Sequence, residues 1–442
     1  MSEPVPTVVL GFGLTGQSVA RYLMARDNRP IVLDSRPAQP LATQWDQLEI
    51  HWGVEDWPSQ VLRHADRVVV SPGLPPHHPL VRQAREAGLP VVSDIDLFMS
   101  EIDAPVVGVT GTNGKSTVVS LIGHLLQSAG MKCRVGGNLG VPALELLKDD
   151  CQIVVLELSS FQLAHSERLK LASAGVLNIS DDHRDWHLDF DSYRKAKLSI
   201  YASAAYRVGR PNDETPMDAY VASGSSCIGS WQVSQKNEAP WLYFDKAPLL
   251  PVSELPLAGA HNAENCLWAM ALVQPWIDPE KACRLLSGFT GLPHRFTSVK
   301  GPEGIRCIND SKATNVGSTL AALTGFKQDA KLILIAGGDS KDADLKPLGA
   351  AMHGRVRLLI TLGQDAQKLN TVAEERDIAW RQVNDMDQAV EVALAYAEAG
   401  DTVLLSPACA SLDMYSNFAA RGDDFAQCVA KHSASLQPEE TS

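Results

Sequence analysis

The sequence predicts an α/β protein of three domains in series: an N-terminal Rossmann-like parallel sheet, a central P-loop ATPase-like domain and a C-terminal Rossmann-like domain. Three observations support this fold class. The 442 residues suffice for about three domains of ordinary size. Short apolar runs alternate with helical spacing, as in parallel strands joined by helices. Glycine-rich turns follow two of these runs, where such folds hold anionic ligands.

The first predicted domain covers residues 1–93 and is expected to form a parallel sheet with right-handed crossovers. Its strands are expected at residues 7–10, 31–34 and 68–70, with a helix from residue 14 to 26. Because the carboxyl ends of parallel strands meet at one edge of a sheet, the loops that follow these strands should lie together.

The second predicted domain covers residues 94–292 and the third covers residues 293–442. In the second, strands are expected at 106–110, 153–158 and 174–178, and helices at 116–129 and from about Asn262. Residues 205–250 are rich in glycine, serine, proline and asparagine, and they predict a small antiparallel lobe. In the third domain a second open parallel sheet is expected, with strands at 305–308, 332–336, 358–362 and 403–405.

A phosphate-binding loop is predicted between the apolar run at 106–110 and the helix that follows it. Backbone N–H groups of the turn and the positive end of the helix dipole face an anion, and Lys115 adds a full charge. The expected phosphate-binding residues are Gly111, Thr112, Asn113, Gly114, Lys115, Ser116 and Thr117. Val109 stands where the usual pattern has glycine, so this is a variant loop. The alternative is a structural turn with a surface lysine, which gives no reason for Lys-Ser-Thr after a strand.

The N-terminal turn Gly11-x-Gly13-x-x-Gly16, followed by Asp34, fits a dinucleotide-binding fingerprint. Taken alone it suggests NAD. However, such a loop can hold any nucleotide diphosphate, and Asp34 can accept a hydrogen bond from any ribose or base. A purely structural turn is the remaining alternative, and the residues alone leave the nucleotide open.

Polar residues follow several other predicted strands. Glu157 ends an apolar run beside the phosphate loop, where a carboxylate can hold Mg²⁺ or serve as a helix cap. His183 is either a second metal ligand or a structural residue, and Lys197 on a helix face would ordinarily be solvated. Arg295 lies at a domain junction, where it either stabilises phosphate charge or forms an interdomain ion pair.

Three segments of the third domain place polar groups at the rim of its sheet. Residues 309–315 and 337–341 each follow a strand. Residues 406–418 are expected to open a helix with small residues, which gives another terminus that accepts an anion.

Composition excludes several classes of function. The 39 basic and 52 acidic residues give a net charge of −13, which argues against a nucleic-acid partner. Eight scattered cysteines without a C-x-x-C pair indicate reduced thiols in a cytoplasmic protein without structural zinc. No apolar run approaches the roughly 20 residues of a membrane span, and the G-x-S-x-G hydrolase pattern is missing.

Taken together, the motifs resemble the Mur ligases of peptidoglycan synthesis, in order and over the whole chain. They are the phosphate loop, Glu157-Leu-Ser-Ser-Phe-Gln, His183 with Lys197, His261-Asn262-x-x-Asn265, Leu292-Pro-His-Arg295 and residues 309–315. The turn at 11–16, Leu33-Asp-Ser-Arg-Pro37, residues 136–140 and residues 406–418 are similar to the branch that adds D-glutamate to UDP-N-acetylmuramoyl-L-alanine.

This resemblance implies an ATP-dependent amide ligase that forms an acyl phosphate and acts in the cytoplasm as a monomer. It implies that the N-terminal turn holds UDP and not NAD. The implied contacts to the UDP-linked substrate are Leu14, Thr15, Asp34, Ser35, Arg36, Ser71, Gly73, Asn138, Ser159 and His183. Asn262, Asn265, Arg295 and Asp310 would join the loop around ATP. Thr314, Lys341, Ser411 and Phe418 would meet D-glutamate.

The resemblance also implies a Mg²⁺ site formed by Ser116, Glu157, His183 and a carbamylated Lys197, with Lys115, His183 and Lys197 as the catalytic residues. A lysine ammonium would repel Mg²⁺, whereas a carbamate offers the oxygen donors that a hard cation prefers. Either His183 or solvent would take the proton of the D-glutamate amine. The alternatives are another amide ligase of this architecture, an NAD-dependent dehydrogenase and a nucleotide-switched binding module.

Overall fold

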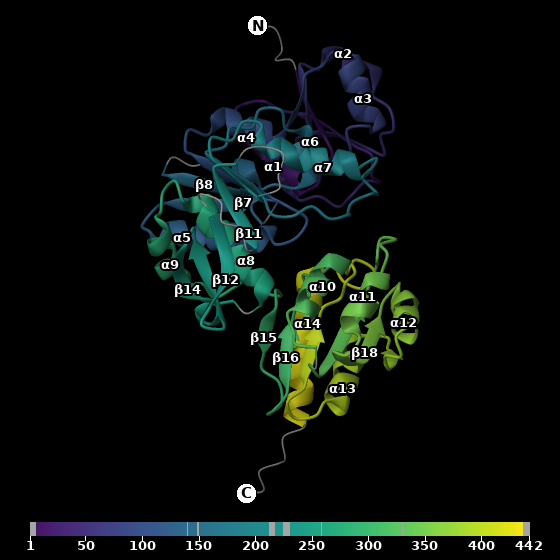
Figure 1. Cartoon of the computed structure of the whole chain (residues 1–442). Helices are drawn as coiled ribbons and strands as arrows, with labels where there is room; N and C mark the ends of the chain where they lie inside the picture. The colour runs from purple at the N-terminus through teal and green to yellow at the C-terminus, as the bar shows by residue number, and fades with distance from the viewer. Residues whose placement is uncertain are drawn as a thin grey trace, which may run out of the picture. The chain divides into compact units, whose positions relative to one another are not determined.

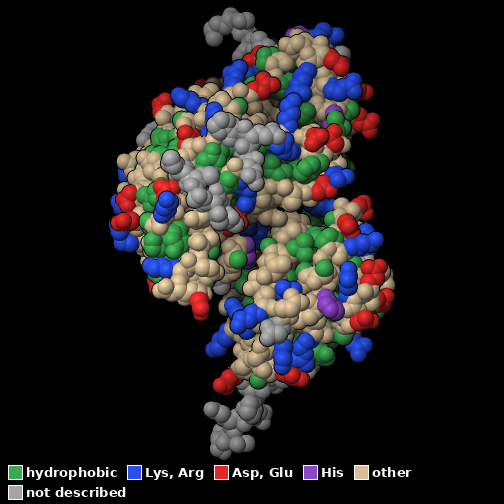
Figure 2. Space-filling model, in the orientation of Figure 1, with side chains coloured by type: hydrophobic (Ala, Val, Ile, Leu, Met, Phe, Trp, Pro, Cys, Tyr) green, Lys and Arg blue, Asp and Glu red, His purple; other side chains and the backbone are tan. Residues whose placement is uncertain are grey.

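The computed structural model of the chain describes residues 6–138, 140–147, 150–211, 217–223, 230–257, 259–328 and 330–435. The chain divides into two compact units (Figure 1). One consists of Met1–Leu255 with Glu264–Phe289, and the other of Pro256–Ala263 with Thr290–Ser442. Three sheets of five, nine and six strands confirm the predicted three-domain α/β class. On the face shown in Figure 2, acidic and basic side chains are interspersed.

The first sheet is parallel throughout, in the order β3-β2-β1-β4-β5. Its strands are β1 Thr7–Leu10, β2 Ile31–Asp34, β3 Glu49–Trp52, β4 Arg67–Val70 and β5 Val91–Ser93, and its helices are α1 Leu14–Met24, α2 Ser59–His64 and α3 Pro79–Glu86. The three predicted strands are confirmed. The other two were missed because β3 is half-exposed with a mixed sequence and β5 has only three residues. The order reverses between β1 and β4, where ligands bind in such sheets.

The first and central sheets share one hydrophobic core. A single buried cluster includes Val9 and Val69 of the first sheet, Phe98 of α4 (Asp94–Glu101), and Val106 and Leu156 of the central sheet. This apolar contact joins the two sheets within one compact unit.

The central sheet has the order β14-β13-β12-β11-β10-β9-β6-β8-β7. The strands are β6 Val106–Thr110, β7 Cys133–Gly137, β8 Ile153–Glu157, β9 Ser173–Val176, β10 Arg207–Gly209, β11 Ala219–Ser223, β12 Ser230–Lys236, β13 Ala239–Phe244 and β14 Ala247–Pro251. The accompanying helices are α5 Lys115–Ser128, α6 Ser160–His165, α7 Phe190–Leu198, α8 Ala260–Val273 and α9 Pro279–Leu286. The predicted strands of this region are confirmed to within two residues.

The separate antiparallel lobe predicted for residues 205–250 is wrong. Strands β10, β11 and β12 extend the central sheet in parallel, and only β13 and β14 are antiparallel. Tight turns explain the change of direction. Asn237 and Glu238 have φ values of 51° and 63°, and Asp245 has 51°, in the left-handed region that two-residue hairpins require. The weak β signals of this region therefore belong to strands that extend one side of a larger sheet.

The third sheet has the order β15-β16-β20-β17-β18-β19 and is parallel except for β15. Its strands are β15 Thr297–Val299, β16 Arg306–Asn309, β17 Leu332–Gly337, β18 Val356–Leu362, β19 Trp380–Gln382 and β20 Thr402–Leu405. Its helices are α10 Val316–Thr324, α11 Lys346–Met352, α12 Ala366–Glu374, α13 Met386–Tyr396 and α14 Phe418–Ser435. Helices α10 to α12 cover one face and α13 with α14 the other (Figure 1), so the predicted second open sheet is confirmed.

The helix expected to open within residues 406–418 begins only at Phe418. The side chain of Asn417 accepts a hydrogen bond from the Ala420 amide at 2.9 Å, which makes Asn417 the helix cap. Ala408 has a φ of 60°, in the left-handed region, which no helical turn contains. The predicted anion-accepting helix terminus at Ser411 is therefore wrong, and Ser411 lies in a loop.

Asp94, the first residue of α4, supplies a stability prediction. Its carboxyl group is buried and burial raises its pKa to about 7. The folded state therefore holds this proton more tightly than the unfolded chain, so the stability it contributes is present below about pH 4 and is lost as the pH rises towards 7. Asp94→Asn should remove about 2–3 kcal/mol of the fall in unfolding free energy between pH 5 and 7.5. Denaturant titrations of both proteins at the two pH values measure this, and equal pH slopes would contradict it.

Candidate active site

The phosphate loop is a sharp glycine turn between β6 and α5. Gly114 has a φ of 86° and caps α5, and Gly111 has a φ of 154°. A Cβ atom at Gly114 would lie 2.7 Å from Oδ1 of Asn265, so glycine is needed both for the backbone and for the close approach of α8. Ser116 and Thr117 are buried in the first turn of α5. The structure thus brings Asn265 against the predicted loop.

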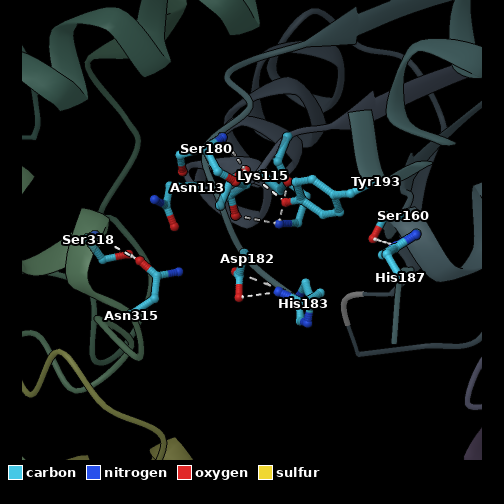
Figure 3. A network of polar contacts seen from close by, with 12 residues as sticks. Asn113, Lys115, Ser160, Ser180, Asp182, His183, His187, Tyr193, Asn315 and Ser318 are labelled. Atoms are coloured by element: carbon cyan, nitrogen blue, oxygen red, sulfur yellow. Dashed lines mark hydrogen bonds and ion pairs between the residues drawn. The ribbon is translucent and has the colours of Figure 1, made fainter. Parts of the chain in front are cut away.

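The end of β9 holds the loop from behind. The Asn113 amide donates to Oδ1 of Asn178 at 2.9 Å, and the Asn178 side chain donates back to the Asn113 carbonyl at 3.0 Å. The Thr112 amide donates to the Asn178 carbonyl at 2.8 Å. The Thr112 hydroxyl lies 2.8 Å from the Tyr193 hydroxyl and accepts from the Ser180 amide at 3.0 Å (Figure 3). Neither Asn178 nor Tyr193 was predicted as a site residue, although Asn178 lies just two residues after the buried strand β9.

Two lysines converge on the carbonyl oxygen of Gly111. Nζ of Lys115 donates to it at 2.7 Å and to the Thr112 carbonyl at 2.7 Å. Nζ of Lys197, on α7, donates to the same Gly111 oxygen at 2.8 Å. Burial, followed by the nearby Lys115 charge, lowers the pKa of Lys197 to about 6. Lys197 is therefore a neutral amine near pH 7.5, unlike the solvated lysine that its helix position alone would indicate.

Glu157 ends β8 beside the loop. Its Oε1 accepts a hydrogen bond from the Asn138 side chain at 2.7 Å, while Oε2 is buried without a hydrogen-bond partner among the described residues. A buried carboxylate oxygen without a donor is the kind of ligand that a hard cation takes. Within the described ranges, no group of three or more histidine, cysteine, aspartate and glutamate side chains is arranged to hold a metal. The unpaired Oε2 of Glu157 is thus the feature of this site that fits a hard cation.

His183 lies in a strained turn after β9, with a φ of 56°. Its amide donates to Oδ1 of Asp182 at 2.9 Å, and its Nε2 lies 3.7 Å from Oδ2 of Asp182 (Figure 3). Its ring meets that of Phe161 edge to face, with centroids 4.7 Å apart. The fixed backbone and the neighbouring carboxylate orient the imidazole. Asp182 was not among the predicted site residues.

Three loops meet at the carboxyl edge of the first sheet. The Phe12 amide donates to Oδ2 of Asp34 at 2.7 Å, and the Ser71 hydroxyl donates to the Gly11 carbonyl at 2.8 Å. Arg36 donates to both Asp34 oxygens, at 2.9 and 2.7 Å. Burial alone would raise the pKa of Asp34, but these hydrogen bonds outweigh it and lower the pKa. The loops that carry the predicted residues Leu14, Thr15, Asp34, Ser35, Arg36, Ser71 and Gly73 are thus brought together, and Leu14 is 78% exposed.

Two predicted substrate residues of the central sheet make structural contacts. Besides its bond to the Glu157 side chain, Asn138 donates its amide to the Glu157 carbonyl at 2.8 Å. The Ser159 hydroxyl caps α6 by accepting from the Gln162 amide at 3.1 Å. Both residues therefore lie beside the end of β8, next to the predicted metal ligand.

In the second compact unit, the predicted residues Asp310, Thr314, Lys341, Ser411 and Phe418 follow the carboxyl ends of β16, β17 and β20. Asp310 accepts hydrogen bonds from the Ser406 hydroxyl at 3.0 Å and the Phe296 amide at 3.2 Å, and burial raises its pKa to about 7. Nζ of Lys312 lies 4.1 Å from the centre of the Phe418 ring. The remaining predicted residues of this unit are Asn262, Arg295, Thr314, Lys341 and Ser411.

A buried arginine that the sequence analysis missed, Arg421 of α14, ties these loops together. Its guanidinium donates to the Ser311 hydroxyl and carbonyl at 3.0 and 2.9 Å, to the Gly337 carbonyl at 3.3 Å and to the Cys409 carbonyl at 3.2 Å. The residue is 3% exposed, and no described carboxylate forms an ion pair with it. A positive charge therefore lies inside the rim that carries the predicted amino-acid contacts. Arg421 could not be recognised from the sequence because an arginine in a helix is ordinarily exposed to solvent.

The sites define a ligand class: a nucleotide-phosphate loop with a neighbouring carboxylate, and a second glycine turn in a parallel sheet. The comparison with known protein families is consistent with this class. The MurD-like N-terminal domain matches residues 6–93, the Mur ligase middle domain matches residues 109–273, and the Mur ligase glutamate ligase domain matches residues 294–409. The chain belongs to the Mur ligase family, as its motifs predicted.

Individual relatives show which enzymes of the family this chain is similar to. The UDP-N-acetylmuramoylalanine--D-glutamate ligase of Escherichia coli K12 is 41% identical over 430 residues, which cover 95% of this chain and 97% of that protein. The ligase of the same name from Pectobacterium atrosepticum is 43% identical over the same shares. Among solved structures, MurC from Thermotoga maritima aligns with a TM-score of 0.62 at 16% identity, over 97% of this chain and 99% of that one. That likeness shows the shared fold.

Proposed function

We propose that this chain is an ATP-dependent ligase that joins D-glutamate to UDP-N-acetylmuramoyl-L-alanine through an acyl phosphate. The observation that carries the proposal is the phosphate loop: a left-handed glycine turn, with Lys115 and Lys197 on the Gly111 carbonyl, beside a buried carboxylate that lacks a donor. The 41–43% identity to relatives named for this activity supports the substrates. The alternative function, an NAD-dependent dehydrogenase, would give Lys115 no role.

The proposed assignment of residues is the one that the family resemblance implies. Gly111–Thr117 and Asn265 would contact the ATP phosphates, and Asn262, Arg295 and Asp310 are proposed as further ATP-binding residues. The N-terminal loops at Leu14, Asp34 and Ser71 hold UDP, and Asn138, Ser159 and His183 follow the rest of the substrate. Thr314, Lys341, Ser411 and Phe418 hold D-glutamate. The proposal also covers the domain bounds 1–93, 94–292 and 293–442, a monomeric state and a cytoplasmic location.

In this mechanism the chain supplies positioning and charge. The L-alanyl carboxylate attacks the γ-phosphorus of ATP, the bond from that phosphorus to the β-phosphate oxygen breaks, and ADP leaves as the acyl phosphate forms. Lys115 and the loop amides stabilise the negative charge that spreads over the phosphoryl oxygens. The D-glutamate amine, once deprotonated, attacks the acyl carbon and phosphate leaves. Both carboxylates of D-glutamate need polar partners, and Lys341 would supply a positive charge to one of them.

Mg²⁺ would be held by Ser116, Glu157, His183 and carbamylated Lys197, and it would neutralise phosphate charge when bound. The neutral, buried amine of Lys197 is the form that reacts with CO₂, since an ammonium has no lone pair to donate. Asn138 fixes Oε1 of Glu157, which leaves Oε2 for the cation. None of the helices in the described ranges has the length and apolar character of a membrane span.

The deciding experiment incubates the protein with ATP, Mg²⁺ and UDP-N-acetylmuramoyl-L-alanine, with and without D-glutamate. We expect equimolar ADP, phosphate and a product heavier by one glutamyl residue, only when D-glutamate is present. L-Alanine, meso-diaminopimelate and L-glutamate serve as controls. Preference for one of these, or reduction of NAD without ADP release, would contradict the proposal.

A further inference from the structure

His165 forms a buried hydrogen bond between the central and first sheets. It ends α6, the short helix that Ser159 caps just beyond Glu157. Its Nε2 lies 2.7 Å from the carbonyl oxygen of Leu74, and the residue is 4% exposed. Since a carbonyl only accepts, Nε2 carries the proton. Nδ1 is buried without a partner among the described residues, and burial lowers the pKa of the ring to about 4, so the imidazole is neutral.

Leu74 in turn supports the N-terminal glycine turn. It closes the loop after β4, where its amide donates to the Ser71 carbonyl at 3.1 Å. Its Cδ1 would lie 2.8 Å from a Cβ atom at Gly11, so the leucine packs directly against that glycine. The Ser71 hydroxyl donates to the Gly11 carbonyl from the same loop. The Ser71–Leu74 loop is therefore the back wall of the turn assigned to UDP.

The other polar contacts of this region serve a different purpose. The amides of Glu167 and Arg168 donate to Oδ1 of Asp96 at 3.0 and 2.9 Å, and the Ser166 hydroxyl lies 3.1 Å from that of Ser93. These bonds fix the chain after α6 to the start of α4, which lies between the two sheets in sequence. Ser93 ends β5, at one side of the first sheet, whereas the bond from His165 reaches the loop after β4, next to the Gly11 turn.

We propose that His165 is a positioning residue for the UDP-linked substrate, because its bond to Leu74 sets the glycine turn of the first sheet against the end of β8. The inference rests on the proposed function. In the proposed function one substrate molecule spans this region. Its uridine end binds at the Gly11 turn, and its own L-alanyl carboxylate reacts beside Glu157. An error in the placement of the turn would therefore move the reacting carboxylate away from ATP or weaken binding of the uridine end.

The test compares His165→Leu with His165→Gln, whose side-chain amide can still donate to a carbonyl. We expect His165→Leu to raise KM for UDP-N-acetylmuramoyl-L-alanine about tenfold, the size associated with loss of one buried hydrogen bond, with KM for ATP unchanged. His165→Gln should recover most of this loss. His124→Leu is the matched control, because Nε2 of His124 also bonds a backbone carbonyl, that of Leu285 at 2.8 Å, in the same compact unit. It should leave both KM values unchanged.

A second variant keeps the test decisive if His165→Leu does not fold. Leu74→Ala should raise the same KM, and adding it to His165→Gln should cost no more than Leu74→Ala alone. Wild-type KM values in folded His165→Leu, or an equal rise in KM for ATP, would overturn the inference and leave the proposed function standing. A wild-type protein that does not use the UDP-linked substrate would overturn the proposed function itself.

Discussion

Replacing Lys115 by alanine should lower the rate of ADP formation at least about a thousandfold while the protein stays folded. Nζ of Lys115 lies within hydrogen-bond distance of two loop carbonyls, at the start of α5, where the γ-phosphate is proposed to bind. Charge that develops on the phosphoryl oxygens has to be met by groups already in place, and alanine removes the ammonium. A thousandfold loss corresponds to about 4 kcal/mol of transition-state stabilisation.

The measurement is ADP release at saturating substrates, with far-UV circular dichroism and thermal unfolding to verify the fold. Lys195→Ala is the matched control, because Lys195 lies in α7 near the same site but faces solvent. That variant should keep wild-type turnover. A decrease smaller than tenfold in Lys115→Ala would show that this loop is not the catalytic phosphate cradle.

The phosphate loop and the sheets could be predicted from the sequence because residues close together in the chain mark them. Gly111 and Gly114 must be glycines for backbone reasons, and a buried parallel strand such as Val106–Thr110 is apolar at nearly every position. These features are written in neighbouring residues. The strand β3 was missed for the converse reason, since Glu49–Trp52 is half-exposed and has no run of apolar residues to mark it.

The parts of the site that were missed depend on residues distant in sequence. Asn178 is recognisable as a loop residue, but only the pairing of β6 with β9 shows that it holds Asn113. Arg421 lies in a helix, and only the fold shows that its guanidinium enters the carboxyl edge of the third sheet. The helix start predicted at Ser411 was wrong for the same reason. Small residues after a strand are compatible with a helix start or with a loop, and only the fold shows that Ser411 lies in a loop.

The two lysines on Gly111 illustrate how the fold changes the chemistry of a residue. By composition alone Lys197 is a solvated charge, yet it is 2% exposed and lies near a second cation. Both the desolvation and the neighbouring Lys115 charge favour its neutral form. A helix position that looks ordinary in the sequence therefore supplies a nucleophilic amine beside the Glu157 carboxylate.

Lys197→Ala should lower ligase activity by a hundredfold or more, and short carboxylic acids such as acetate or formate should restore part of it. Alanine leaves a cavity beside the Gly111 carbonyl, since Lys197 is almost fully buried there. If the working form of Lys197 is a carbamate, a small carboxylate in that cavity replaces its oxygen donors. If the working form is the amine, a carboxylate has the wrong charge and cannot rescue, whereas a small alkylamine can.

The rescue experiment therefore distinguishes the carbamate from the amine by the charge of the small molecule that restores activity. Acetate, formate and methylamine should be titrated against Lys197→Ala, and Lys195→Ala should respond to none of them because its side chain fills no buried space. In the wild type, ¹³C-labelled bicarbonate should give a carbamate carbonyl resonance that is missing in Lys197→Ala. Full activity of Lys197→Ala without any additive, or rescue by methylamine alone, would exclude the carbamate. In either case the cation proposed at Oε2 of Glu157 would be held by Ser116, His183 and ligands other than a carbamate, and Oε2 would still be the buried carboxylate oxygen without a donor among the described residues.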